Sequence, residues 1–175
     1  IAEALLKSLT PTQHSALRTK ASKDVDAYEY YLRGRQFFKR FRKVDIEYAQ
    51  QMFRQALDID AEFAAAWAGY ADCFSFLVIY ADPVPGYPKK ARSASKKALG
   101  LDPGLAEAHA SRGLAYLVSN NFDAATDKLE RVLRIKAEYA PAWSRLSWIA
   151  LQTDVPKRSI EMAKRSNSFA HGDTK

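Results

Sequence analysis

The chain has 175 residues, of which 47% are hydrophobic, and its formal net charge is +7 at pH 7. This hydrophobic content is typical of a folded protein and argues against disorder. The single cysteine, Cys73, excludes an internal disulfide framework and favours a reducing compartment, so we expect a cytoplasmic protein. No apolar run approaches the roughly 18 residues needed to cross a bilayer, so we expect no membrane segment.

Two segments carry much of the positive charge. Residues 31–43 contain six cations and no acid, and residues 86–97 contain five cations and no acid. Such patches can attract phosphate groups or an acidic partner. Solvated helix faces are the plainer interpretation of both.

The chain starts at Ile1, within a helical pattern, and we expect a piece of a longer polypeptide. Residues 1–9 predict one short helix. Thr10, Pro11 and Gln13 predict the start of a second, because they supply a capping hydroxyl, a first-turn proline and a capping-box amide. We expect residues 1–26 to be N-terminal helices that form the tail of a preceding domain.

A short sequence motif, called a phrase below, recurs along the rest of the chain. It begins at Trp67 and at Trp143, and a similar phrase begins at His109, which is 34 residues before Trp143. Small residues follow each phrase at matched spacing. The pattern resembles the tetratricopeptide repeat (TPR) family, in which W-x2-L-G-x2-Y is followed by A-x3-F-x2-A and a boundary proline.

The resemblance implies an all-α fold, a right-handed superhelical solenoid of antiparallel helix pairs. We expect four repeats, over residues 27–63, 64–105, 106–139 and 140–175. Each has a first helix, helix A, and a second, helix B. Small residues should let helix A lie close to helix B, and large residues should fill the gaps between successive pairs. The small residues are Gly34, Ala71, Gly113 and Ser147, and the large ones are Tyr30, Trp67, His109 and Trp143.

Local signals predict where several helices begin and end. We expect Asp45 to cap helix B of the first repeat and Asn121 to cap that of the third. Gly100 is expected to end a helix. Residues 81–88 contain three prolines and one glycine, so helix A of the second repeat should stop near Tyr80 and a projecting loop should follow.

The amino-acid sequence of residues 27–34 and 49–72 is similar to that of bacterial multidomain regulators. Those proteins join TPR arrays to adenylate cyclase, winged-helix or kinase modules, and many carry a TolB-like domain before the repeats. The resemblance implies a protein-interaction scaffold whose concave groove is lined by helix A. We expect the groove to bind a protein or peptide segment, which is a separate partner, another domain of the same chain or a second copy. The candidate partner-binding residues are Tyr28, Tyr31, Arg35, Phe38, Asp72, Phe76, Leu114, Leu117, Trp148 and Leu151.

Residues 33–43 support an alternative function. Their cations alternate with aromatic residues, as in proteins that bind single-stranded nucleic acid by phosphate contacts and base stacking. The same aromatic residues are also needed for repeat packing. Strong salt dependence of binding would favour nucleic acid over protein.

The sequence contains no recognisable pattern for catalysis, metal or cofactor binding. The three histidines are far apart, and no zinc-ligand spacing or glycine-rich phosphate loop is present. Cys73 and His109 are expected to be packing residues. We therefore expect no enzyme activity, no metal and no cofactor.

Overall fold

The structure is a computed structural model that describes residues 24–80, 84–153 and 156–170. The expected helices before residue 24 lie outside the described residues. The described part contains helices and no strand. Its helices are α3 (Val25–Phe38), α4 (Lys43–Ile59), α5 (Ala64–Tyr80), α6 (Tyr87–Leu101), α7 (Ala106–Leu117), α8 (Phe122–Ile135), α9 (Ala140–Gln152) and α10 (Pro156–Ala170).

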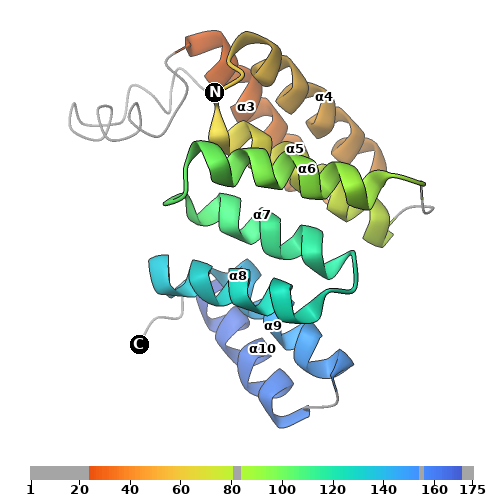
Figure 1. Ribbon diagram of the computed structural model, residues 1–175, viewed down its shortest axis with the longest axis vertical. Coiled ribbons are helices and arrows are strands. Elements are labelled where there is room, and N and C mark those ends of the chain that lie inside the picture. The colour runs from red at the N-terminus through yellow and green to blue at the C-terminus, as the bar shows by residue number, and fades with distance from the viewer. Residues whose placement is uncertain (1–23, 81–83, 154–155, 171–175) are drawn as a thin grey trace.

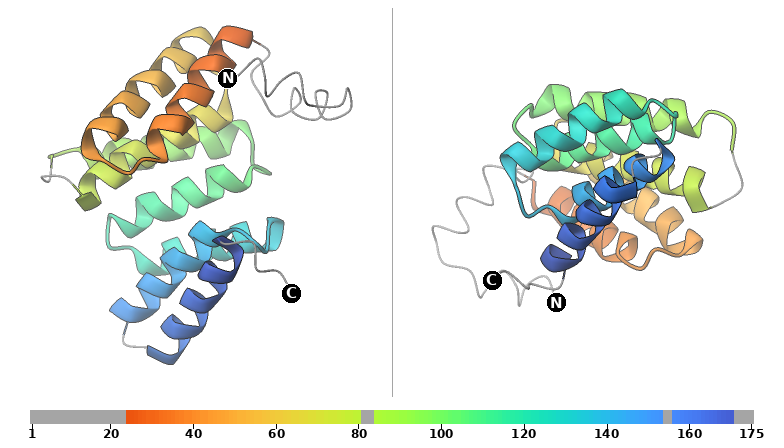
Figure 2. Two further views of the ribbon diagram at one scale, coloured as in Figure 1. Left: turned by 180° about the vertical axis from the view of Figure 1, so that it is seen from behind. Right: turned by 90° about the horizontal axis from the view of Figure 1, so that it is seen from below.

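The helices form stacked antiparallel pairs, α3 with α4, α5 with α6, α7 with α8, and α9 with α10 (Figure 1). Each pair rests on the next, so the chain advances along the long axis of the molecule. Figure 2 shows the same stack from behind and from below. This arrangement confirms the expected all-α class. Within the described ranges, no helix is both long and apolar enough to cross a bilayer.

Glycines allow close approach between A and B helices, within a pair at Gly34 and Gly113 and between successive pairs at Gly69. Phe53 of α4 is completely buried, and its ring lies under two glycines. A Cβ atom added at Gly34 would lie 2.8 Å from the Phe53 ring, and one added at Gly69 would lie 2.6 Å from it. At Gly113 the added atom would lie 2.9 Å from Leu129. The packing role expected for Gly34 and Gly113 is confirmed, and Gly69 is an additional position of the same kind.

The large residue at the start of α5, α7 and α9 makes a hydrogen bond as well as filling space. Trp67 donates its ring N–H to the carbonyl of Ala61 at 2.9 Å, and Trp143 donates to that of Ala137 at 2.8 Å. His109 repeats the contact, with Nε2 2.8 Å from the carbonyl of Pro103. A carbonyl can only accept, so the proton of His109 is on Nε2. A ring N–H at this position therefore ties α5, α7 and α9 to the turn before each of them.

Two of the expected helix ends are wrong. Helix α4 begins at Lys43, and Asp45 lies inside its first turn, buried, where it pairs with Arg40 and Arg42 instead of capping the helix. Helix α6 continues past Gly100 to Leu101. It ends there because Asp102 precedes a proline, which disfavours helical backbone at the preceding residue.

Two other expectations are confirmed. Asn121 caps α8, since its side chain accepts from the backbone N–H of Ala124 at 3.2 Å. Helix α5 ends at Tyr80, and α6 does not begin until Tyr87, where Gly86 adopts the positive φ of 92° that favours glycine. Between them the structure describes residues 84–86, and residues 81–83 lie outside the described ranges.

Candidate functional site

All four A helices contribute to a single elongated groove with a volume of ≈ 890 Å³. It is lined by α3 and the turn after it, by α5, by α7, and by α9 together with Tyr139 just before it. Seven of the ten candidate residues line the groove. They are Arg35, Phe38, Asp72, Phe76, Leu114, Leu117 and Trp148.

The other three candidates lie elsewhere. Tyr28 and Tyr31 pack in a core cluster between the first two pairs, where the ring centroid of Tyr31 lies 4.9 Å from that of Phe63 and 5.9 Å from that of Phe53. Tyr31 therefore takes part in the contact of helix A with helix B, because Phe53 belongs to α4. Leu151 is 60% exposed near the end of α9 and does not line the groove.

Four aromatic side chains gather at one end of the groove. The ring of Phe76 contacts those of Phe38, Phe41 and Tyr80, with centroids 4.9, 5.4 and 5.6 Å away. Phe41 is 57% exposed and Tyr80 is 70% exposed. Phe41 also has a positive φ of 52°, an uncommon conformation for a bulky residue that is found where surrounding structure imposes it. This end of the groove thus presents aromatic surface to solvent.

Trp148 lies at the other end of the groove. Its side chain is 42% exposed, and its ring meets that of Phe122 edge-on, with centroids 6.0 Å apart. Leu117, which is buried, also lines the groove and belongs to the core cluster of the last two pairs. An apolar surface backed by the core is therefore present at this end too.

A polar cluster lines the groove beside these apolar side chains. Asp72, Arg35, Arg145 and Tyr139 all line the groove and interact electrostatically. Burial raises the pKa of Asp72, although Arg145, Ser111 and Arg35 oppose the increase. Within the described part of the chain, Oδ1 of Asp72 is enclosed and has no hydrogen-bond partner. Burial likewise raises the pKa of Tyr139 to about 12.

The charge of Asp72 is unfavourable for the fold, so Asp72→Asn is expected to raise the free energy of unfolding at pH 7. The folded-state pKa lies above the ordinary value of 3.8, so ionisation of Asp72 destabilises the folded state at neutral pH, and this effect vanishes below both pKa values. The gain should therefore be larger at pH 7 than at pH 4 in urea denaturation. Asp58→Asn, at an exposed position of α4, is the control and should change stability little. A loss of stability at pH 7 in the Asp72 variant would contradict the prediction.

Comparison with solved structures identifies the architecture. No protein-family model matches the chain, and no curated protein sequence matches it significantly. A thermophilic TPR protein of Thermus thermophilus, TTC0263, superposes with a TM-score of 0.71 at 19% identity, over 91% of this chain and 80% of that one. The chain has the TPR fold.

Two further TPR-type structures are similar to it. MamA gives a TM-score of 0.57 at 15% identity, over 91% of this chain and 85% of its own. The second TPR domain of human RPAP3, solved in complex with an HSP70 peptide, gives 0.53 at 21% identity, over 70% of this chain and 97% of its own. At these identities the likeness concerns the fold.

Several residues that line the TPR groove are not among the sequence candidates, including Arg145, Tyr139 and Phe41. Arg145 and Tyr139 flank the start of α9, and Phe41 lies in the turn after α3. The family pattern places groove residues at fixed positions of helix A, and none of these three occupies one. The cluster of cations and aromatic residues at 31–43 was the only signal for Phe41.

The basic segment 33–43 is partly neutralised within the TPR array. Arg33 pairs with Glu29 at 2.5 Å, and both Arg40 and Arg42 pair with the buried Asp45. Arg40 also lies over the ring of Phe37, 5.2 Å from its centroid. Three of the six cations in residues 31–43 are therefore engaged with acids of the same repeat.

Cys73 lies fully buried in α5, and burial raises the pKa of its thiol well above the ordinary value. A protonated, enclosed thiol is a packing group and a poor nucleophile. In the ranges 24–80, 84–153 and 156–170, no three His, Cys, Asp or Glu side chains are grouped so that they could hold a metal ion.

Proposed function

We propose that the chain is a protein-interaction scaffold that binds an apolar segment of another polypeptide in its groove. The observation that carries the proposal is the exposed aromatic surface at both ends of one groove built by all four A helices. Exposed aromatic anchors are typical of binding hot spots. The RPAP3 domain with the same fold was solved with a peptide bound, which supports a peptide-sized occupant.

The arrangement of the groove favours an occupant with two bulky apolar residues separated by a polar one. Phe38, Phe41 and Phe76 would contact the first apolar residue, and Trp148 the second. A polar residue between them would lie near Asp72. An enclosed carboxylate oxygen without a hydrogen-bond partner, as Oδ1 of Asp72 is, is unfavourable for the isolated chain, and an N–H or O–H donor from the occupant would relieve this.

We also propose the context of this scaffold. The chain divides into an N-terminal segment, 1–26, and a TPR array from 27 to 175, and it belongs to a cytoplasmic bacterial regulatory protein. The similarity of residues 27–34 and 49–72 to the sequences of such regulators supports this context. The occupant is then another segment of the regulator, a second copy or a separate protein.

The proposal is tested with one double variant that removes exposed aromatic side chains of the groove, and with a second double variant as its control. Phe41→Ala combined with Trp148→Ala is expected to weaken peptide binding by ~2 kcal/mol or more, since these are the proposed anchors. Peptides would be selected against the chain from a displayed random library, and their affinity measured by fluorescence anisotropy. Tyr48→Ala combined with Ile160→Ala is the control, because these residues are 49% and 58% exposed and do not line the groove.

If both double variants bind the selected peptides as well as the parent does, the groove is not the binding site. Nucleic-acid binding through residues 33–43 predicts a different result. Lys39→Glu with Lys43→Glu would then weaken binding of a single-stranded oligonucleotide, and affinity would fall steeply with added salt. The peptide proposal predicts little effect of either, since exposed charges mainly alter the association rate.

A further inference from the structure

Helix α6 has a charge distribution that the groove does not explain. It contains five cations and no acid, and all five side chains are exposed. They are Lys89, Lys90, Arg92, Lys96 and Lys97. In the described residues none of them lies within ion-pair distance of a carboxylate. Arg92 also donates to the hydroxyl of Ser119 at 3.0 Å, and Lys90 lies over the rings of Phe74 and Tyr87, but neither contact neutralises the charge.

The equivalent helices of the neighbouring repeats show that the fold does not require this charge. Helix α4 contains two cations and three acids, and α8 contains three of each. Their charges pair, as Arg54 does with Asp58, Lys128 with Asp127 and Glu130 with Arg158. Helix α10 has four cations and one acid, but Arg158 and Arg165 pair with glutamates, so α6 is the B helix whose cations have no acid on their own helix.

The position of the lysines makes the excess unfavourable for the isolated chain. Lys89 and Lys90 lie in the first turn of α6, where the positive end of the helix dipole repels cations. Helices α3, α4, α7 and α8 instead carry an acid in the first turn. Arg92 and Lys96 are four residues apart on the helix, a spacing at which like charges repel. An anionic partner would remove this repulsion.

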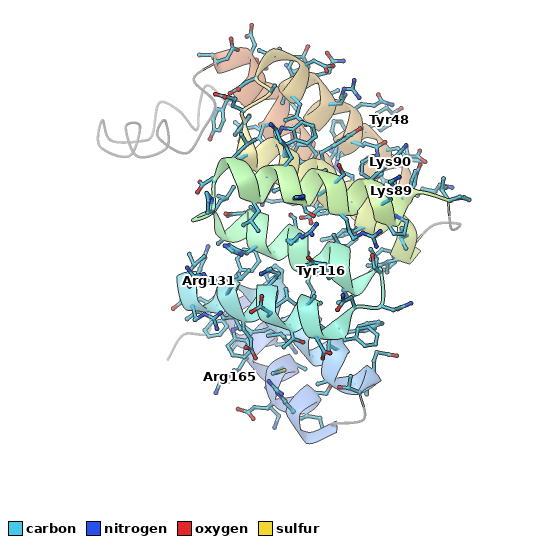
Figure 3. All side chains as sticks on the ribbon, in the orientation of Figure 1. Tyr48, Lys89, Lys90, Tyr116, Arg131 and Arg165 are labelled. Atoms are coloured by element: carbon cyan, nitrogen blue, oxygen red, sulfur yellow. The ribbon has the colours of Figure 1, made fainter. Side chains whose placement is uncertain are left out.

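Exposed apolar residues border the same end of α6. Val84 is 41% exposed and its carbonyl accepts from the backbone N–H of Tyr87 at 3.2 Å, so it lies directly beside the first turn. Tyr80, 70% exposed, ends the partner helix α5. Figure 3 shows Lys89 and Lys90 at this end of α6.

We propose that α6 and the turn before it form a peripheral binding site for an anionic phospholipid bilayer. Lysines close to a membrane surface are attracted by acidic headgroups, and small apolar side chains beside them can enter the interfacial region. A nucleic acid offers phosphates but nothing that would bury Val84. The site belongs to a helix B, whereas the groove is built mainly by the A helices, so membrane contact is a function separate from peptide binding.

Vesicle flotation of the whole chain tests this proposal. Vesicles of phosphatidylcholine with about one third phosphatidylserine are expected to bind the chain, and vesicles of phosphatidylcholine alone are not. Replacing Lys89, Lys90, Lys96 and Lys97 by glutamine should lower the partition coefficient at least about fiftyfold, since each lysine near the surface contributes about fivefold. Val84→Ser should weaken the binding that persists at high salt.

The matched control removes four cations from the next B helix and its end. It replaces Lys128, Arg131, Arg134 and Lys136 by glutamine, which changes the net charge equally and should leave most vesicle binding in place. The midpoint temperature of thermal unfolding should not be lower in the α6 variant than in the parent, because the lysines that it lacks repel one another. An equal loss of vesicle binding in both variants would show that binding depends on net charge alone and would overturn the proposal. Equal binding to both vesicle types, or displacement from vesicles by a stoichiometric single-stranded oligonucleotide, would also overturn the proposal.

Discussion

Phe53→Ala is expected to lower the free energy of unfolding by about 3–5 kcal/mol, the range measured for buried aromatic residues in other proteins. Phe53 is completely buried, and its ring fills the space under Gly34 and Gly69, with helices α3 and α5 on either side. Neither glycine has a side chain that could move into the cavity, so the site cannot readily collapse. Urea denaturation monitored by circular dichroism measures the loss.

Two companion variants make this prediction specific to the glycine contacts. Phe41→Ala, at a position 57% exposed, should change stability by less than about 1 kcal/mol. Gly69→Ala alone should cost about 1–3 kcal/mol, because the new methyl group would meet the Phe53 ring. In the Phe53→Ala background the same change should cost little. Additive losses in the double variant would mean that the glycines and Phe53 do not pack together.

Trp143→Ala is expected to cost about 3 kcal/mol, at the lower end of the range for large aromatic residues, because its ring is only partly buried. The variant loses the hydrogen bond from Nε1 to the carbonyl of Ala137 and the contact of the ring with the guanidinium of Arg165, 4.9 Å from its centroid. Stability in a solenoid is shared between neighbouring repeats. The loss should therefore extend over α7 to α10.

Hydrogen exchange locates that loss. Amides of α7 to α10 should exchange faster in the Trp143→Ala variant, while those of α3 and α4 should keep most of their protection. Trp148→Ala is the control, since Trp148 is 42% exposed and lines the groove. A change below about 1 kcal/mol for Trp143→Ala would place the residue outside the repeat interface.

The helices could be predicted well because their signals are local. The stop at Tyr80 follows from nearby prolines, and the cap at Asn121 from its own side chain. The errors at Asp45 and Gly100 arise where two local signals compete. Asp45 is held by arginines of the preceding turn, and Gly100 is overruled by the proline after Asp102. A residue that is suited to a helix end caps or ends a helix only when neighbouring residues do not engage its side chain or end the helix elsewhere.

The candidate groove was predictable only where residues occupy fixed positions of helix A. Phe38 and Phe76 satisfy that rule and line the groove, whereas Tyr31 satisfies it and packs against Phe53 instead. The side chains of Arg145 and Tyr139 come to lie near Asp72 because successive pairs stack and bring helices of distant repeats together. The spacing of residues within one repeat does not predict that Arg145 and Tyr139 lie near Asp72.

The sequence by itself determined the helical class, the repeat period and the positions where small residues meet large ones. These depend on side-chain size at separations of a few residues to one repeat, which a linear pattern records. Only the tertiary structure decided which aromatic residues are exposed in the groove and that Asp72 lies enclosed near two arginines from different helices. Exposure and charge environment depend on how repeats pack on one another, because burial is set by every neighbour in space, including those far away along the chain.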